Sequence, residues 1–323
     1  MITKIIADTS ITIDWLSFTH RFLLPEQVID SLGLTDMPWV HAHGSNGYRD
    51  RLQFAGISIH YNGQEGMGTW CEMTGQGCRT YEELSQVGWK PLIYWLASGD
   101  CNANVTRLDI ACDDRSGTLP LSAITLDVRL GNYVSKAKAY QLISSGKKDE
   151  VQGTTVVIGS PKSLVRIRIY DKAAEQHRPA DEHWVRCELQ LRGERALAFL
   201  EKASEDGFGV TYAGVLLNYL RFTTPRHDDT NKSRWPTRRY WSKFIGNANR
   251  ISIYAVPGMD YSEEQCCNFV FQQAGNAIDA IIKMYGLQRF QYLLENRNVR
   301  PNPKYLQLVE HHRAKNTPAI KKS

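Results

Sequence analysis

The stretch Val165-Arg166-Ile167-Arg168-Ile169-Tyr170-Asp171-Lys172 carries the pattern that decides both the fold and the chemistry of this chain. Side chains alternate between the two faces of a β-strand. The Val and Ile residues of the stretch therefore face a core, whereas Arg166, Arg168 and Tyr170 face the other way. Lys172 joins them if the strand continues, or lies one residue into a following helix. The pattern predicts a strand that is buried on one face and carries three cations around a tyrosine on the other.

A tyrosine between two guanidinium groups, with an ammonium nearby, is suited to attack a phosphodiester. The cations of Arg166, Arg168 and Lys172 would hold the phosphate oxygens and lower the pKa of the Tyr170 phenol, which is ordinarily about 10. The alternative is an edge strand with a solvated face of arginine and tyrosine.

Acidic residues recur at similar places on other expected strands. Asp109 lies in Thr106–Ala111, Glu188 in Trp184–Gln190, and Glu72 near the end of a short strand before a glycine turn. Three carboxylates on one sheet face would form an oxygen site for Mg²⁺ or Mn²⁺, which could polarise a phosphate. The alternative is cross-strand pairing of these carboxylates with neighbouring arginines.

The order of expected elements indicates an α+β fold. Most strands fall in the first two-thirds of the chain, and the region after residue 225 is basic and mostly helical. The polar stretch 223–233 marks the boundary between them. We expect a domain over residues 1–225 and a basic helical region over 226–323. Helices are expected over 80–97, 120–130, 194–202, 262–285, 287–295 and 302–312.

The charge of the chain is unevenly distributed. Residues 226–323 hold 16 Lys and Arg against 8 Asp and Glu, whereas residues 1–225 hold 23 against 26. Cations alternate with aromatic residues at the start of the basic region, which suits phosphate contacts and base stacking. The alternative is a helix with a buried aromatic side and basic side chains that extend to solvent. The expected DNA contacts are Arg234, Arg238, Arg239 and Lys243.

Composition excludes several other classes of protein. With 323 residues, 42% hydrophobic and 23% charged, the chain can bury a core. No apolar run is long enough for a membrane span, and the start lacks a secretory signal, so we expect a cytoplasmic protein. Seven cysteines without a C-x-x-C pair indicate free thiols. No P-loop, G-x-G-x-x-G or G-x-S-x-G motif supports nucleotide binding or a serine hydrolase.

One histidine pair, His41 and His43, would share a face of a strand and could bind a metal. A Gly44-Ser45-Asn46-Gly47 segment follows at once. We therefore favour two histidines in a loop or at a strand end over a metal site.

Five motifs, in this order, resemble the Rep_trans replication initiation factors across residues 10–225. They are Asp14-Trp15-Leu16-Ser17-Phe18-Thr19, Glu72-Met73-Thr74-Gly75-Gln76-Gly77-Cys78-Arg79, Thr106-Arg107-Leu108-Asp109-Ile110-Ala111, Ile158-Gly159-Ser160 with Arg168-Ile169-Tyr170-Asp171-Lys172, and Arg186-Cys187-Glu188-Leu189. The resemblance implies an HUH-like fold, in which an antiparallel sheet carries the site without relying on a histidine pair.

The resemblance also implies functions for single residues. Tyr170 matches the nucleophile that becomes linked to a 5′ phosphate, and Asp109, Glu188 and Glu72 match acidic positions that we expect to bind the metal. Asp14 also fits the pattern, but we favour a structural role for it. The C-terminal third matches nothing in the resemblance, and origin recognition is the function we expect there.

The sequence therefore predicts an initiator of rolling-circle replication from a phage or plasmid. It would nick one DNA strand with Mg²⁺ or Mn²⁺, leave a 3′-OH primer and later rejoin the strand. Its partners would be single-stranded and double-stranded origin DNA, and the resemblance allows a host helicase and a second copy of the chain. The alternatives are a conjugative relaxase with the same chemistry, a non-catalytic DNA-binding regulator and an RNA-binding protein.

Overall fold

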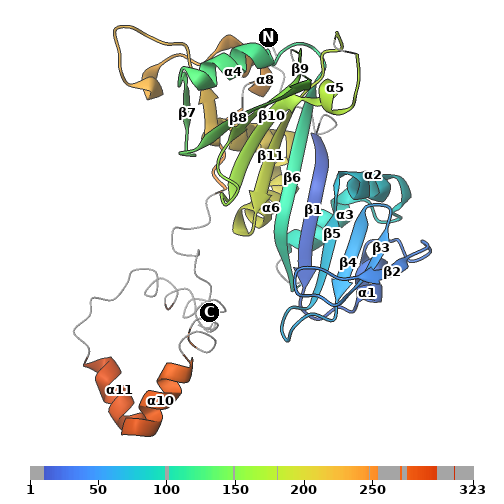
Figure 1. The fold of residues 1–323 in the computed structure, drawn as a ribbon, viewed down its shortest axis with the longest axis vertical. Coiled ribbons are helices and arrows are strands. Elements are labelled where there is room, and N and C mark those ends of the chain that lie inside the picture. Colours follow the sequence, from blue (N-terminus) through green and yellow to red (C-terminus); the bar gives the residue numbers. More distant parts are fainter. Residues whose placement is uncertain are drawn as a thin grey trace, which may run out of the picture. The chain divides into compact units, whose positions relative to one another are not determined.

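Ten strands form one antiparallel sheet that runs through the larger part of the molecule (Figure 1). The computed structural model describes residues 11–98, 102–147, 150–179, 181–246, 248–253, 270, 275–296 and 309. The strand order is β2-β3-β4-β5-β1-β6-β11-β10-β9-β8. The strands are β1 (Ile11–His20), β2 (Val40–His43), β3 (Asp50–Phe54), β4 (Ile57–Tyr61), β5 (Thr69–Met73), β6 (Ala103–Asp114), β8 (Tyr140–Lys147), β9 (Glu150–Ile158), β10 (Val165–Asp171) and β11 (Val185–Arg192).

Helices lie against one face of this sheet, and the other face carries polar side chains together with the short helix at Lys172–Glu175. Helices α3 and α6 contact β6, and Figure 1 shows both of them behind the central strands. The helices of this unit are α1 (Pro25–Ser31), α2 (Gly75–Leu84), α3 (Trp89–Ala97), α4 (Leu121–Arg129), α5 (Lys172–Glu175), α6 (Glu194–Asp206), α7 (Phe208–Tyr219) and α8 (Arg239–Ile245). A separate pair of short strands, β7 (Tyr133–Ser135) and β12 (Leu220–Phe222), and a 3₁₀ turn at Lys232–Arg234 complete it. The expected α+β class with an antiparallel sheet and flanking helices is confirmed.

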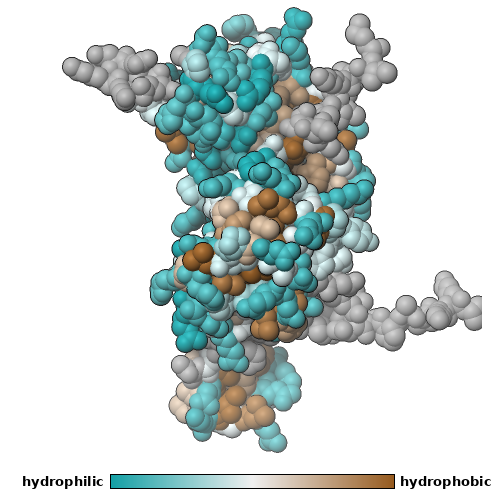
Figure 2. Space-filling view, turned by 90° about the vertical axis from the view of Figure 1, so that its right-hand side faces the viewer, coloured by the Kyte–Doolittle hydropathy of each residue, from teal (hydrophilic) through white to brown (hydrophobic). Residues whose placement is uncertain are grey.

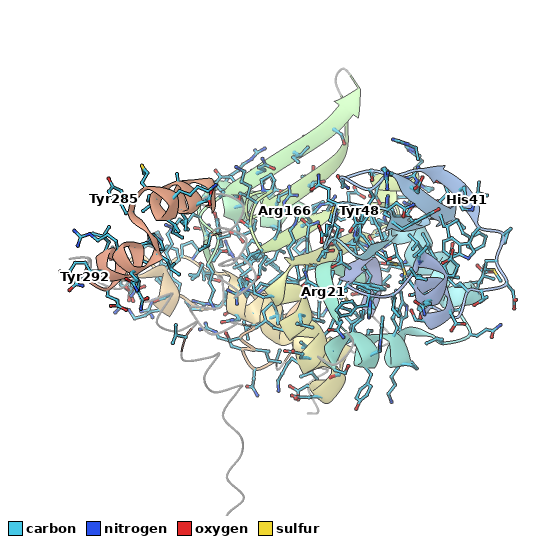
Figure 3. All side chains as sticks on the ribbon, turned by 90° about the horizontal axis from the view of Figure 1, so that it is seen from below. Arg21, His41, Tyr48, Arg166, Tyr285 and Tyr292 are labelled. Carbon is cyan, nitrogen blue, oxygen red and sulfur yellow. The ribbon has the colours of Figure 1, made fainter. Side chains whose placement is uncertain are left out.

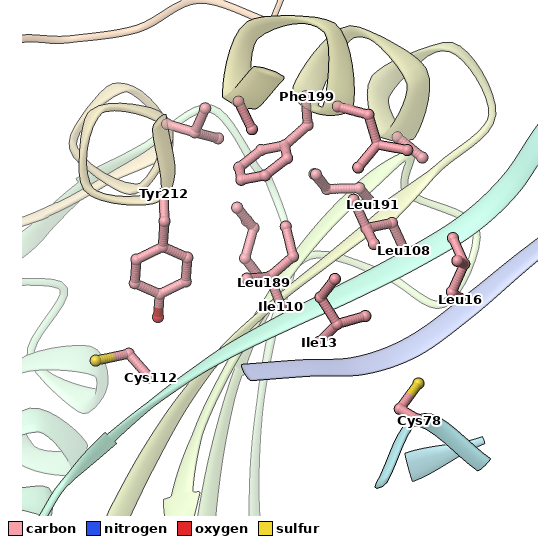
Figure 4. Packing of buried hydrophobic residues seen from close by; sticks show 14 of the residues in the cluster. Ile13, Leu16, Cys78, Leu108, Ile110, Cys112, Leu189, Leu191, Phe199 and Tyr212 are labelled. Carbon is pink, nitrogen blue, oxygen red and sulfur yellow. The ribbon is translucent and has the colours of Figure 1, made fainter. Parts of the chain in front are cut away.

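The core lies between the sheet and the helices. Phe199 on α6 and Tyr212 on α7 pack among the apolar residues of β6 and β11 (Figure 4). Burying an apolar side chain of this size contributes roughly 1.5–3 kcal/mol. The Tyr212 hydroxyl donates to the Cys187 carbonyl at 2.6 Å, so its polar group is satisfied inside the core. The alternation that the sequence predicts on β10 is observed, because Val165, Ile167 and Ile169 all face this core.

The expected helix over 80–97 is two helices. The first, α2, begins at Gly75 rather than Thr80, because the Thr74 hydroxyl accepts from the backbone N–H of Gly77 and caps the helix there. The chain then breaks at Ser85, and Gly88 adopts a φ of 76° before α3 begins. A positive φ favours glycine and interrupts the helix at this point.

The first compact unit extends to Ile253, so the predicted boundary at 225/226 lies inside it. The reason is packing: Trp241 on α8 is fully buried and meets the Phe222 ring edge-on at 5.0 Å. The aromatic side of this segment thus belongs to the core of the first unit. This part of the basic region therefore packs as a helix with a buried aromatic side, which was the alternative to a surface that stacks on bases.

The second unit comprises residues 254–323 and contains α10 (Gly275–Tyr285) and α11 (Leu287–Glu295). Gly286, with a φ of 81°, connects the two helices. Helix α11 has the predicted bounds, and α10 forms the described end of the helix expected over 262–285. The helix expected over 302–312 lies outside the described residues apart from position 309.

Two predictions from composition can be compared with the described parts of the chain. The described cysteines, Cys71, Cys78, Cys112 and Cys187, are free and buried, as expected, while the other three lie outside the described residues. Among the described helices, none has both the length and the apolar composition that crossing a bilayer requires. Figure 2 shows hydrophobic residues interspersed with hydrophilic ones on the face turned to the viewer.

Candidate active site

The register of three neighbouring strands gathers the predicted tyrosine, arginines and two of the acids on one face. Residues directly opposite each other in an antiparallel pair point to the same side, with Cβ atoms about 4.5–5.5 Å apart. We call this face, opposite the helices, the polar face. Its opposed pairs on β10, β11 and β6 are Tyr170–Arg186, Arg168–Glu188, Arg166–Gln190 and Gln190–Asp109.

Tyr170 lies near the end of β10 with only 4% of its surface exposed. Its hydroxyl is 3.4 Å from Oε2 of Glu188, and the Arg168 guanidinium lies 4.9 Å from its ring centre. Burial, followed by the carboxylates of Glu188 and Glu175, raises the pKa of the phenol above its ordinary value. The prediction that the surrounding cations lower this pKa is therefore wrong for the free protein, because burial and the carboxylates outweigh them.

The two acids are each held by an arginine. Nη1 of Arg168 lies 2.9 Å from Oε1 and 3.2 Å from Oε2 of Glu188. Arg107 binds both oxygens of Asp109, at 2.9 and 2.5 Å. Burial raises the pKa of Glu188, and the Asp109 carboxylate adds to the increase while Arg168 opposes it. The cross-strand pairing that we weighed against a metal site is thus present between Arg168 and Glu188, whereas Arg107 and Asp109 pair along one strand.

Glu72 does not join these acids. It lies on β5 opposite Ser17 of β1, and Ser17 lies opposite Arg107 of β6. Strands lie about 4.8 Å apart, so β1 separates Glu72 from Asp109 by roughly 10 Å. In the described part of the chain, no three His, Cys, Asp or Glu side chains form a group that could hold a metal ion. The predicted three-carboxylate site is therefore not assembled, and of its three acids Asp109 and Glu188 are the two that lie on adjacent strands.

The donors and the charge of Asp109 and Glu188 suit a divalent ion. They lie on adjacent strands, on one face, and supply the carboxylate oxygens that Mg²⁺ and Mn²⁺ prefer. The Asp109 carboxylate raises the pKa of Glu188 because the two negative charges repel each other. A cation bound to both carboxylates would offset this repulsion. The pair fits such an ion if Arg107 and Arg168 turn toward substrate.

Lys172 lies where the sequence places it, at the first residue of α5. Its ammonium is 5.7 Å from the centre of the Tyr170 ring and forms an ion pair with Glu175. Arg166 differs, because no acidic residue of the described chain pairs with it and its Nε atom has no hydrogen-bond partner. Burial, Arg168 and Arg192 lower the pKa of Arg166, which reflects the density of positive charge around it.

A pocket of about 320 Å³ opens beside the tyrosine. Arg168, Tyr170 and Glu175 line it on one side, and Ser145 and Thr155 from β8 and β9 on the other. Its volume and its polar lining suit a phosphate with part of a nucleotide.

Sequence reasoning gave Asp14 a structural role and did not assign one to Arg186. Asp14 is the extra residue of a β-bulge in β1, between Ile13 and Trp15. The bulge directs its carboxylate to Nη1 of Arg186 at 2.9 Å, while Asp113 binds Arg186 at 2.7 and 2.8 Å. Arg186, opposite Tyr170, is thereby fixed by two acids. The position of Asp14 in the first motif was the sequence signal that could have pointed to this contact. The ion pair between Asp14 and Arg186 agrees with the structural role that we expected for Asp14.

The four cations predicted to contact DNA divide into two classes. Arg234 binds Asp229 at 2.7 Å through two nitrogens, and Arg238 binds the buried Asp127 at 2.5 Å. Arg239 and Lys243 are exposed, and among the described residues neither has an acidic partner. They are four positions apart on α8 and so share one side of that helix.

His41 and His43 lie on β2, an edge strand of the sheet, and not in a loop. His41 is opposite Leu52, whose side chain is in the core, so the pair faces away from the polar face. Figure 3 labels His41 and Arg166 on different halves of the sheet. Both histidines thus lie on a strand, with His43 at its end, and on the opposite face of the sheet from Tyr170.

Two family models match the chain. The model for "Replication initiation factor" matches residues 103–296, more than half of the chain. The model for "Rolling Circle replication initiation protein N-terminal domain" matches residues 10–90. The boundary between them falls between β5 and β6, so the two matches divide the polar face between them.

A curated relative and a solved structure are similar over most of this chain. The Bacillus subtilis (strain 168) protein named "Putative DNA relaxase NicK" is 27% identical over 234 residues, covering 68% of this chain and 66% of its own length. The chain thus matches slightly less than two-thirds of that relative. The rolling circle replication initiator protein from Geobacillus stearothermophilus is 31% identical, with a TM-score of 0.69, over 76% of this chain and 99% of that one.

Proposed function

Because the chain belongs to the family of replication initiation factors, we propose that it nicks one DNA strand at an origin and starts rolling-circle replication there. The origin would be that of a phage or plasmid. The observation that carries the proposal is the polar face, on which a tyrosine lies 3.4 Å from one of two acids that arginines hold in place.

In the proposed reaction, the Tyr170 oxygen attacks the scissile phosphorus, and the bond from phosphorus to the 3′ oxygen breaks. Glu188 is placed to accept the phenol proton, because its Oε2 atom is 3.4 Å from the hydroxyl. The departing 3′ oxygen takes up a proton and becomes the primer end, while the 5′ phosphate stays on the tyrosine. The pKa of the Tyr170 phenol is raised. Positive charge must therefore lie beside the reacting groups in the DNA-bound state before the tyrosine attacks.

The arginines would supply that charge. Arg166 has no acidic partner among the described residues, so it can bind a phosphate oxygen without losing an ion pair. Arg168 lies 4.9 Å from the Tyr170 ring centre and lines the pocket beside it. Guanidinium groups bind two oxygens of a phosphate at once and thus orient it for in-line attack.

Asp109 and Glu188 are the residues that would hold Mg²⁺ or Mn²⁺. A bound divalent ion polarises a phosphate oxygen and stabilises charge that develops on it. The phosphotyrosine bond conserves the energy of the broken linkage, so the reverse attack by a 3′-OH rejoins the strand without ATP. The target must be single-stranded or extruded, because a stacked duplex hides the phosphate and base from such a pocket.

The exposed pair Arg239 and Lys243 supports a contact with duplex DNA at α8. Such contacts act through phosphates and weaken as salt increases. Within the same chemistry, a conjugative relaxase is a second candidate, since the name of the matched B. subtilis protein describes a DNA relaxase. The two functions are distinguished by whether the gene lies on a phage or plasmid or on a conjugative element.

The experiment compares the chain with Tyr170→Phe and Tyr140→Phe on supercoiled plasmid that carries the gene and its flanks, with Mg²⁺ or Mn²⁺. We expect open-circle DNA and a DNA-linked protein band from the unchanged chain and from Tyr140→Phe, whose ring is 47% exposed on β8. Tyr170→Phe should give neither product. Nicking by Tyr170→Phe would exclude Tyr170 as the nucleophile, and tight binding without nicking by any form would favour a non-catalytic regulator.

A further inference from the structure

Unpartnered polar atoms gather on the polar face. In the described part of the chain, several buried side-chain nitrogens and oxygens have no hydrogen-bond partner, and those on this face belong to Arg51, Trp15, Arg166, Arg192 and Gln190. Buried polar groups are normally hydrogen-bonded, because an unmade bond in the interior costs free energy. A polar ligand that binds this face would supply the missing partners.

The register also places a line of polar residues across six strands of this face, and Arg192 is the one residue of that line whose buried nitrogen has no partner among the described residues. Starting from β3 and ending on β11, the residues that lie opposite one another are Gln53, Ser58, Glu72, Ser17, Arg107 and Arg192. At one end, Arg192 lies directly opposite Arg107, and the Asp109 carboxylate bound to Arg107 offsets one of the two positive charges. Among the described residues Arg192 has no acidic partner, so this end is suited to DNA phosphates.

The other end of the line opens into a second pocket, of about 490 Å³. Glu72, Ser58, Gln53 and Arg51 supply its polar groups, and Phe54 contributes an aromatic ring. Burial raises the pKa of Glu72, while the positive charges of Arg107 and Arg51 oppose the increase. Roughly four strand spacings, about 20 Å, separate this pocket from Arg192. The distance is too large for Glu72 to contact the scissile phosphate.

Aromatic rings lie along the same face between the two ends. Trp15 stacks under the Arg107 guanidinium at 4.1 Å, and Trp70 stacks on the buried His60 at 4.4 Å. Trp15 and Trp70 are each partly exposed. Aromatic and guanidinium planes beside a line of cations are typical of surfaces that bind single-stranded nucleic acid.

We propose that the pocket around Glu72 binds a guanine base of the single strand, several nucleotides from the nick, while Arg107 and Arg192 hold phosphates between them. The Watson–Crick edge of guanine presents two N–H donors side by side, and these match the two oxygens of one carboxylate. Thymine presents a single donor between two carbonyl oxygens, which a carboxylate repels. In this proposal the pocket recognises the DNA sequence, and Tyr170 attacks the scissile phosphate. This inference rests on the proposed function, because it takes single-stranded DNA as the substrate.

The experiment measures binding without nicking. The full chain with Tyr170→Phe is titrated, without divalent ions, into a fluorescent 20-mer of thymidine or into the same oligonucleotide with guanine at every fourth position. Lithium buffer prevents guanine quadruplexes. We expect the guanine oligonucleotide to bind about tenfold more tightly. Adding Glu72→Gln should reduce this ratio to about one, because the amide replaces one acceptor oxygen with a donor.

Two matched variants test the assignment. Glu83→Gln makes the same charge change at an exposed position of α2 and should keep the ratio. Arg192→Gln should weaken binding of both oligonucleotides by a similar factor and keep the ratio, as expected for a phosphate contact. Circular dichroism and thermal melting establish that each variant is folded before binding is compared.

The outcomes separate the two proposals. A guanine preference that Glu72→Gln leaves intact, or equal binding of both oligonucleotides by the parent chain, overturns the guanine pocket while Tyr170 chemistry stands. Failure to bind either oligonucleotide removes the single-stranded substrate on which the proposed function itself depends.

Discussion

The two halves of the polar face differ in how their acidic residues are paired. On β6, β11 and β10, Asp109 and Glu188 are each bound by an arginine, and Arg186 is held between two acids. On β3, β4 and β5, no ion pair of Glu72 or Arg51 is formed within the described chain. Ion pairs fix side chains in place, whereas unpaired groups remain available to a ligand. The comparison suggests that one half is organised for chemistry and the other for recognition.

The largest expected effect comes from replacing the acidic residues of the two halves. Asp109→Asn and Glu188→Gln should each lower the maximum nicking rate by roughly 100-fold or more, because each removes a carboxylate from the proposed ion site. Glu72→Gln should instead increase the oligonucleotide concentration needed for half-maximal rate, with a much smaller change in the maximum. Single-turnover nicking of an oligonucleotide, titrated with Mn²⁺, measures both quantities. An equal loss of maximum rate in all three variants would return Glu72 to the acids of the active site.

A second prediction concerns stability. Glu188→Ala leaves Arg168 without its partner, and we expect it to lower the free energy of unfolding by about 2 kcal/mol. The figure is below that of a fully buried pair because 32% of the Arg168 side chain is exposed. Glu72→Ala breaks no ion pair within the described chain and should cost under about 1 kcal/mol. Urea denaturation followed by tryptophan fluorescence measures both, and similar losses would mean that Glu72 is held as firmly as Glu188.

The smallest expected effect concerns the exposed cations of helix α8. Exchanging exposed Arg239 and Lys243 for glutamine should reduce the slope of log affinity for duplex DNA against log salt by about one to two. Arg234→Gln, at a cation already bound to Asp229, is the control and should change this slope little. Filter binding at several salt concentrations provides the slopes. A larger change for Arg234 than for the exposed pair contradicts the assignment.

The sequence predicted those features that depend on local alternation. The strand over Val165–Asp171, its buried face and the shared polar face of Arg168, Tyr170 and Glu188 all follow from a period of two. The bounds of α11 were equally predictable, because Gly286 precedes it and interrupts the preceding helix.

Features that depend on strand order could not be predicted in this way. Glu72 has the same alternation as Asp109, yet β1 comes between their strands, and no local pattern encodes that insertion. The burial of Trp241 against Phe222 likewise required the tertiary structure, and it moved the end of the first unit to Ile253. The pKa of Tyr170 depends on burial, which residue types alone do not give.

The order of the strands also determines when the site comes into existence during synthesis. Ile13 pairs with Ile110, and Ile110 pairs with Leu189, so the three central strands come from widely separated parts of the chain. Pairings of such long range form slowly, because loops must close before the contacts stabilise them. A nascent chain that has not yet reached β11 lacks Glu188 and Arg186 and cannot assemble the tyrosine site. Translation thus delays the assembly of this site until its last central strand has emerged.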